Sequence, residues 1–263
     1  MSKWASRLLW GIASLGGLVA VLVIYAWFFG TQTFFALQTR YMARRMPIVE
    51  SVPVELEDRT VSTAKGKKLS FQGAEFEVPW EDIDEQKTRI AGKWAVIHFQ
   101  SGRSILLCVG TSDAFLKGLS KDKTPDPEVF VKIFGPQVLK SDYALYDAIY
   151  KTTPSKITLT TPSNRAAGLG VILMVKAIMP PTTDWAIFRV QSKGAKGFQL
   201  GNPARRPKKM CLELFTEDAE YEISISQDGA GGTPPITQAE LNRIIQTVHK
   251  TADAQSTLTV NPA

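Results

Sequence analysis

The stretch Lys93–Gly110, "KWAVIHFQSGRSILLCVG", indicates how most of the chain folds. Two strand-like runs, "KWAVIHFQ" and "RSILLCVG", flank the dipeptide Ser101-Gly102, which has the length and composition of a tight hairpin turn. The runs "KLSF" and "AEFEVPW" flank Gln72-Gly73 in the same way. The sequence therefore predicts an antiparallel sheet built from hairpins.

The middle of the chain carries helix signals. Asp126, Pro127 and Gly135 have the residue types of a cap, a first position and a stop around "PEVFVKIF", and Ser112 and Ser141 are predicted caps of two further helices. The run "SNRAAGLGVILMVKAIMPP", which begins at Ser163, predicts a helix buried against the sheet. A buried strand is the alternative, because β-branched residues recur in this run.

More strands and a last helix follow. The runs "DWAIFRVQ", "GFQLG", "KMCLELFT" and "EYEISISQ" predict strands, and "TQAELNRIIQTVHK" predicts an amphipathic helix. Hairpins, a helical middle, further hairpins and a closing helix together predict an α+β domain with an antiparallel sheet flanked by helices. This order resembles the Mog1/PsbP-like fold, an antiparallel sheet with helices on its faces. The resemblance is topological and implies no function.

The uncharged segment "LLWGIASLGGLVAVLVIYAWFFG", residues 8–30, predicts an uncleaved transmembrane anchor. As a helix, its 22 residues from Leu8 to Phe29 would span about 33 Å, enough for a bilayer core of ~30 Å. Small residues four positions apart (Ala13 with Gly17, Gly16 with Ala20) would let two anchors pack as a homodimer.

The anchor divides the chain into expected segments. They are a basic tail (1–7), the anchor (8–30), an amphipathic juxtamembrane helix (31–46), a linker (47–66), the α+β domain (67–250) and a disordered tail (251–263). The short basic tail favours a cytoplasmic amino terminus and an exported domain. The chain has no Asn-x-Ser/Thr sequon, which favours a bacterial envelope over a glycosylated exterior. The predicted location is therefore the bacterial inner membrane, crossed once, with the domain in the periplasm.

The net charge of +6 belongs mostly to the membrane flank. Residues 1–49 hold five basic residues and no acid, so 26 basic and 25 acidic residues remain for the rest. A near-neutral domain lacks the basic surface of a nucleic-acid binder. Arg40, Arg44 and Arg45 instead suit anionic lipid headgroups.

Both cysteines, Cys108 and Cys211, lie in strand-like runs. In an exported domain they could form a disulfide, whereas two buried thiols are the alternative. No Cys-x-x-Cys pair is present, so neither a redox site nor a zinc site is expected.

No catalytic, metal or cofactor motif stands out in the sequence. His98 is expected to be a structural histidine, and a hydrolase that uses it is the rival hypothesis. The acids of "WEDIDEQK" fail the spacing of a calcium loop and predict the first turn of a short helix instead.

The strongest surface candidate is a basic rim contributed by two connections between strands. Its residues are Lys193, Lys196, Arg205, Arg206, Lys208 and Lys209. Such a rim would bind lipid phosphates or an acidic partner. The sequence thus predicts a non-enzymatic, membrane-anchored domain that binds an unidentified envelope protein or ligand. A cytoplasmic domain held on anionic lipid by its basic segments is the other alternative.

Overall fold

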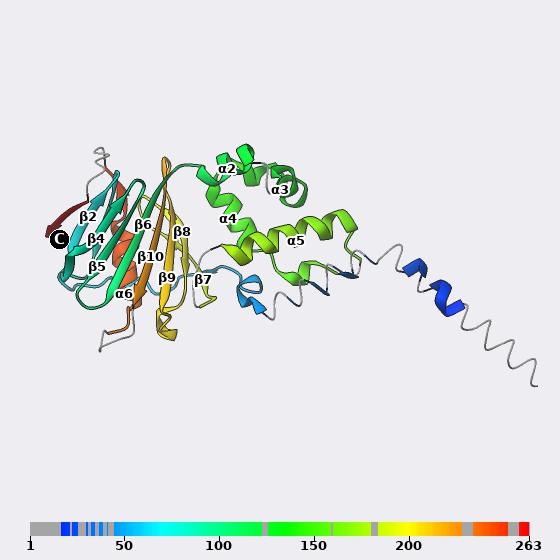
Figure 1. Cartoon of the computed structure of the whole chain (residues 1–263), viewed down its shortest axis with the longest axis horizontal. Coiled ribbons are helices and arrows are strands. Elements are labelled where there is room, and N and C mark those ends of the chain that lie inside the picture. The colour runs from blue at the N-terminus through cyan, green and yellow to red at the C-terminus, as the bar shows by residue number, and fades with distance from the viewer. Residues whose placement is uncertain are drawn as a thin grey trace, which may run out of the picture.

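An eight-stranded sheet lies at the centre of the computed structural model (Figure 1). The structure describes residues 45–262 except 123–125, 159, 180–183, 228–233 and 252–257, together with residues 17–21, 23–25, 30, 33–34, 37–38 and 41. The strands in sheet order are β1 (Val54–Glu55), β7 (Ile187–Gln191), β8 (Lys196–Leu200), β9 (Lys209–Phe215), β10 (Ala219–Gln227), β6 (Arg103–Thr111), β5 (Trp94–Phe99) and β4 (Ile83–Ala91).

The α+β class is confirmed, but the large sheet is mixed and not purely antiparallel. The predicted hairpins form, with β5 and β6 joined at Ser101-Gly102. The exception is the edge strand β1, which pairs in parallel with β7 so that Val54 lies opposite Phe188. A local hairpin pattern cannot predict this pairing, because the two strands are far apart in the chain.

A smaller antiparallel sheet packs on one face of the large one. Its strands in order are β11 (His249–Lys250), β3 (Ala74–Val78), β2 (Lys67–Phe71) and β12 (Thr259–Pro262). The helix α6 (Gln238–Thr247) begins at a capping box formed by Thr237 and Glu240. Its buried Leu241 and Ile244 share the main core with both sheets.

Four helices cover part of the opposite face of the large sheet, and we call them the helical layer (Figure 1). They are α2 (Ala114–Asp122), α3 (Pro127–Phe134), α4 (Asp142–Tyr150) and α5 (Ser163–Ile178). A second core joins the layer to β8 and β9 through Tyr150, Leu169 and Phe198. The predicted helix at Ser163 is confirmed as α5, although most of its contacts are with α3, α4 and residues 47–49.

Short 3-10 turns complete the described part of the chain. They are η1 (Pro47–Val49), η2 (Pro136–Lys140), η3 (Pro154–Lys156) and η4 (Pro203–Arg205). In η1, Ile48 and Val49 are buried in the core of the helical layer. The folded domain therefore already includes the start of the predicted linker at 47–66.

Three local predictions are wrong. Residues 83–91 form the edge strand β4, because pairing with β5 outweighs the helix signal of the acids. Residues 259–262 form β12 on β2, although the tail was expected to be disordered. Ser112 does not cap α2, since the amides of Phe115 and Leu116 donate to the carboxylate of Asp142.

The predicted anchor and juxtamembrane helix lie mostly outside the described residues. Among the residues that are described, no helix is both long enough and apolar enough to span a bilayer.

Candidate functional site

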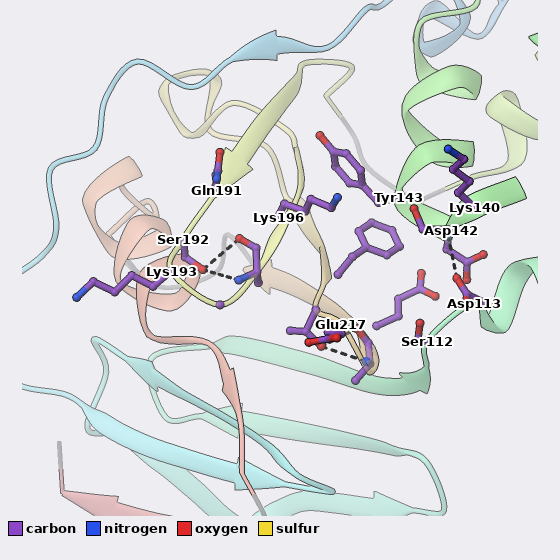
Figure 2. Close-up of a pocket in the computed structure, with 17 residues that line it drawn as sticks. Ser112, Asp113, Lys140, Asp142, Tyr143, Gln191, Ser192, Lys193, Lys196 and Glu217 are labelled. Atoms are coloured by element: carbon purple, nitrogen blue, oxygen red, sulfur yellow. Dashed lines mark hydrogen bonds between the residues drawn. The ribbon is translucent and has the colours of Figure 1, made fainter. Parts of the chain in front are cut away.

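A cleft of about 470 Å³ opens between the start of α4 and two turns of the large sheet (Figure 2). Its lining comes from the β7–β8 turn, the β9–β10 turn, the end of β6 and the residues around the α4 cap. The lining residues with charged side chains are Asp113, Lys140, Asp142, Lys193, Lys196, Glu217 and Glu220. Concave sites with convergent polar groups are where proteins usually bind small ligands.

The first turn of α4 places Asp142 at this cleft. Ser141 caps the helix by accepting a hydrogen bond from the amide of Ala144, as the sequence predicts. Asp142, which is 2% exposed, accepts hydrogen bonds of 2.9 Å from the amides of Phe115 and Leu116. One carboxylate therefore fixes the start of α2 against the start of α4.

Glu220, on β10, faces Asp142 at the floor of the cleft. Burial, together with the nearby Asp142 carboxylate, raises the pKa of Glu220 to about 7, while a hydrogen bond with Tyr146 opposes the shift. Burial also raises the pKa of Asp142, and its hydrogen bonds with two backbone amides oppose this shift. The nearby charge of Asp142 therefore favours the protonated form of Glu220 near neutral pH.

A third carboxyl group lies deeper, under α4. Glu213 of β9 is 6% exposed, and its Oε2 accepts a 2.7 Å hydrogen bond from the hydroxyl of Tyr150. Burial raises the pKa of Glu213 to about 8, and the hydrogen bond from Tyr150 opposes the shift. Glu213 lies directly opposite Glu222 of β10 in the sheet register. The interface between the helical layer and the sheet thus holds several acids that resist ionisation.

Aromatic side chains form the wall of the cleft on the side of β8. Tyr143 stacks on Phe198 with ring centroids 5.3 Å apart, and its ring lies edge-on to Phe215 at 5.9 Å. The ammonium of Lys196 lies 4.4 Å from the centroid of the Tyr143 ring. Figure 2 shows Lys196 pointing toward Tyr143, whereas Lys193 points away from the cleft.

The predicted basic rim does not form as one surface. Lys193 and Lys196 lie at the β7–β8 turn, whereas Arg205, Arg206, Lys208 and Lys209 follow β8 at its other end. A strand of five residues separates the two groups by about 16 Å. Arg205 forms an ion pair with Asp184 at 3.0 Å.

Of the two states left open for the cysteines, the structure has two free thiols. Cys108 of β6 lies opposite Glu222 of β10, and Cys211 of β9 lies opposite Ser224 of the same strand. The strand β10 therefore separates the two thiols, and residues two strands apart are too distant for a disulfide.

His98 lies on β5, in register with Asp84 of β4 and Ser104 of β6, and is only partly buried. The alternation along β5 turns its side chain away from the core that holds Ile97 and Phe99. An acid and a hydroxyl thus lie beside His98, but the carboxylate of Asp84 pairs with Lys87 at 3.1 Å. His98, Asp84 and Ser104 do not line the cleft of Figure 2.

Two further sequence-based expectations concern lipids and metals. Of Arg40, Arg44 and Arg45, only Arg45 is among the described residues, and its guanidinium lies 5.0 Å from the centroid of the Tyr41 ring. In the described part of the chain, no group of three or more His, Cys, Asp or Glu residues is placed to hold a metal ion.

The sequence alone did not predict a role for three acids of this region, Asp142, Glu213 and Glu220. The sequence contains one signal of this kind: Glu213 interrupts the apolar run "MCLELF", and the residues before and after it in the chain are apolar. A charged residue within a buried strand needs a partner, but the sequence does not show that the partner is Tyr150.

Comparisons of the chain with protein-family models, curated proteins and solved structures find no match. Its function is therefore argued from the chemistry of the site.

Proposed function

We propose that this chain is a single-pass membrane protein whose α+β domain lies in the bacterial periplasm and binds an envelope protein or ligand without transforming it. The apolar segment 8–30 supports the anchor. The cleft at the start of α4 supports the binding role, because it presents the partly exposed Glu220 beside the aromatic wall of Tyr143 and Phe215.

Hydrogen bonding within the domain favours binding over catalysis. The two oxygens of Asp142 already accept backbone amides, and Glu213 lies under Tyr150. A catalytic carboxyl group needs an oxygen within hydrogen-bond reach of the reacting atom. Of the three buried or partly buried acids described above, Glu220 has an oxygen left for a ligand at the cleft, so it can hydrogen-bond a hydroxyl, amide or amino group.

One substitution tests both location and binding. Gly194 lies at the mouth of the cleft, and a Cβ there would meet only the Val248 carbonyl oxygen, at 3.9 Å. We expect Gly194→Cys, combined with Cys108→Ser and Cys211→Ala, to react in intact cells with a maleimide that cannot cross the inner membrane. Reaction only after lysis would contradict the periplasmic location.

Occupancy of the cleft is measured with the same variant. We expect Gly194→Cys to react more slowly in cells than in purified protein, because a bound partner covers it. The matched control is Glu85→Cys, at an exposed position on the edge strand β4. If the ratio of the rate in cells to the rate in purified protein is the same at positions 194 and 85, the cleft is not occupied in cells.

An acid–base enzyme is the second candidate, favoured by the pKa of about 7 at Glu220. It predicts that Glu220→Gln abolishes turnover while ligand binding persists. The His98 hydrolase has weaker support, because Asp84 pairs with Lys87. The cytoplasmic alternative is judged by the labelling experiment. Free thiols do not distinguish a cytoplasmic from a periplasmic domain, since β10 keeps Cys108 and Cys211 apart in either compartment.

A further inference from the structure

The outer face of α5 is apolar where a surface helix is usually polar. Its outward positions, Ala167, Val171, Met174 and Ile178, recur every three or four residues and form one stripe. Met174 is 54% exposed and Ile178 is 80% exposed. The opposite face, which includes Leu169 and Leu173, is buried in the core of the helical layer. The helix is therefore apolar on both sides, although the described part of the chain covers only one of them.

The segment of chain that contains this helix carries charge of one sign. Between Asp147 and Asp184 the chain contains no acidic residue and four basic ones, Lys151, Lys156, Arg165 and Lys176. Lys176 points inward and is buried, whereas the other three are exposed, and Lys151 forms an ion pair with Asp147. Lys151 and Arg165 are close enough to Lys156 to lower its pKa, although burial is the larger cause of that shift. Exposed lysines and arginines contribute about 1 kcal/mol each near an anionic membrane surface.

The position of α5 in the chain limits its distance from the proposed anchor. The apolar segment ends at Gly30, and the folded domain begins at Pro47, in η1, which packs against α5. The intervening residues, Thr31–Met46, would span about 24 Å as a helix and about 55 Å when fully extended. The helix α5 is thus within reach of the headgroups on the side where the domain stands.

We infer that the outer face of α5 lies on the lipid bilayer, with Met174 and Ile178 in the headgroup region and Lys156 near anionic phosphates. This inference rests on the proposed anchor but not on its orientation. A short amphipathic surface of this kind binds weakly by itself, and tethering by the anchor raises its effective concentration at the membrane.

The test uses the full chain in nanodiscs of phosphatidylcholine and phosphatidylglycerol. Met174→Cys and Ile178→Cys, each combined with Cys108→Ser and Cys211→Ala, are labelled with bimane. Arg165→Cys is the matched control, because it is exposed on the same helix but off the stripe. Quenching is measured with nitroxide-labelled lipid and with aqueous iodide, and circular dichroism confirms that each variant is folded.

We expect bimane at positions 174 and 178 to lose most of its fluorescence to the nitroxide lipid and little to iodide, with the reverse at position 165. Iodide quenching at all three positions would overturn the inference. Protection from both quenchers at 174 and 178 would also overturn it, because protein would then cover the stripe. If the full chain does not enter nanodiscs at all, the anchor itself is wrong, and this outcome is distinct from the other two.

Discussion

The hydroxyl of Tyr150 donates a 2.7 Å hydrogen bond to Glu213 and thereby joins the last turn of α4 to the middle of β9. Both residues are almost completely buried. A carboxyl group in such a place is stable in its protonated form, which retains a hydrogen-bond partner and carries no charge. The attachment of the helical layer to the sheet is therefore linked to pH.

Glu213→Gln should remove part of this pH dependence. Because the pKa of Glu213 rises from 4.5 to about 8 on folding, the folded protein holds a proton that the unfolded chain releases between these pH values. Stability therefore falls as pH rises from about 4.5 to about 8, by up to about 1.4 kcal/mol per pH unit for this group. Glutamine stays neutral, so the slope should decrease.

The measurement is urea unfolding across that pH range, with Glu85→Gln on the exposed edge strand as the control. The slope should not vanish in the Glu213→Gln variant, because Glu220 also keeps a proton to about pH 7. An unchanged slope would show that Glu213 is already ionised in the folded protein.

Asp142→Asn should change both the pKa of Glu220 and the hydrogen bonds at the start of α2. It removes the negative charge that helps to raise the pKa of Glu220, so that pKa should fall, as measured by carbon NMR of the carboxyl group. The amides of Phe115 and Leu116 should exchange with solvent faster, because asparagine offers them one neutral oxygen in place of two charged ones. Asp126→Asn, at the cap of α3, is the control and should leave both values unchanged.

Lys176→Met should destabilise the helical layer strongly. The buried ammonium donates to the carbonyl oxygens of Val49, Ser51, Tyr150 and Thr152, at 2.6–3.2 Å. Burial, with a smaller contribution from the charge of Lys156, lowers the pKa of Lys176 to about 7, while the charge of Glu50 opposes this shift. Methionine leaves the four carbonyl oxygens without a donor, and each unsatisfied buried group costs about 1–3 kcal/mol.

We expect a loss of at least about 3 kcal/mol in chemical unfolding of Lys176→Met, of the order given by leaving several buried carbonyls unpaired. Lys151→Met removes an exposed lysine from the same region and should change stability by less than about 0.5 kcal/mol. Similar losses in the two variants would refute a special role for Lys176.

Gly197→Ala should disrupt the pairing of β8 with β9. A Cβ at Gly197 would collide with the backbone carbonyl of Glu213, which is not free to move within the sheet. Gly194→Ala, three residues earlier, meets only ordinary contacts and is the matched control. Comparing the two melting temperatures tests this prediction, and equal values would contradict it.

Local patterns predicted most of the elements and few of the contacts between them. The hairpin at Ser101-Gly102 and the cap at Asp126 depend on neighbouring residues, and both are confirmed. The acid-rich strand β4 forms by pairing with the adjacent β5, although its acids suggest a helix. The tail strand β12 forms because the distant β2 offers a free edge, which the sequence does not show. The pair formed by Tyr150 and Glu213 joins residues 63 positions apart for the same reason.

The hydrogen bonds from Lys176 to Val49 and Ser51 have a mechanical consequence. The first folded residues after the proposed anchor are held firmly, because their carbonyls accept hydrogen bonds from Lys176 of α5. The same ammonium also donates to the carbonyls of Tyr150 and Thr152 at the end of α4. A pull on the chain from the bilayer would therefore load α4 and α5 first. These two helices border the cleft and the stripe, so tension from the membrane and occupancy of the cleft would act on the same pair of helices.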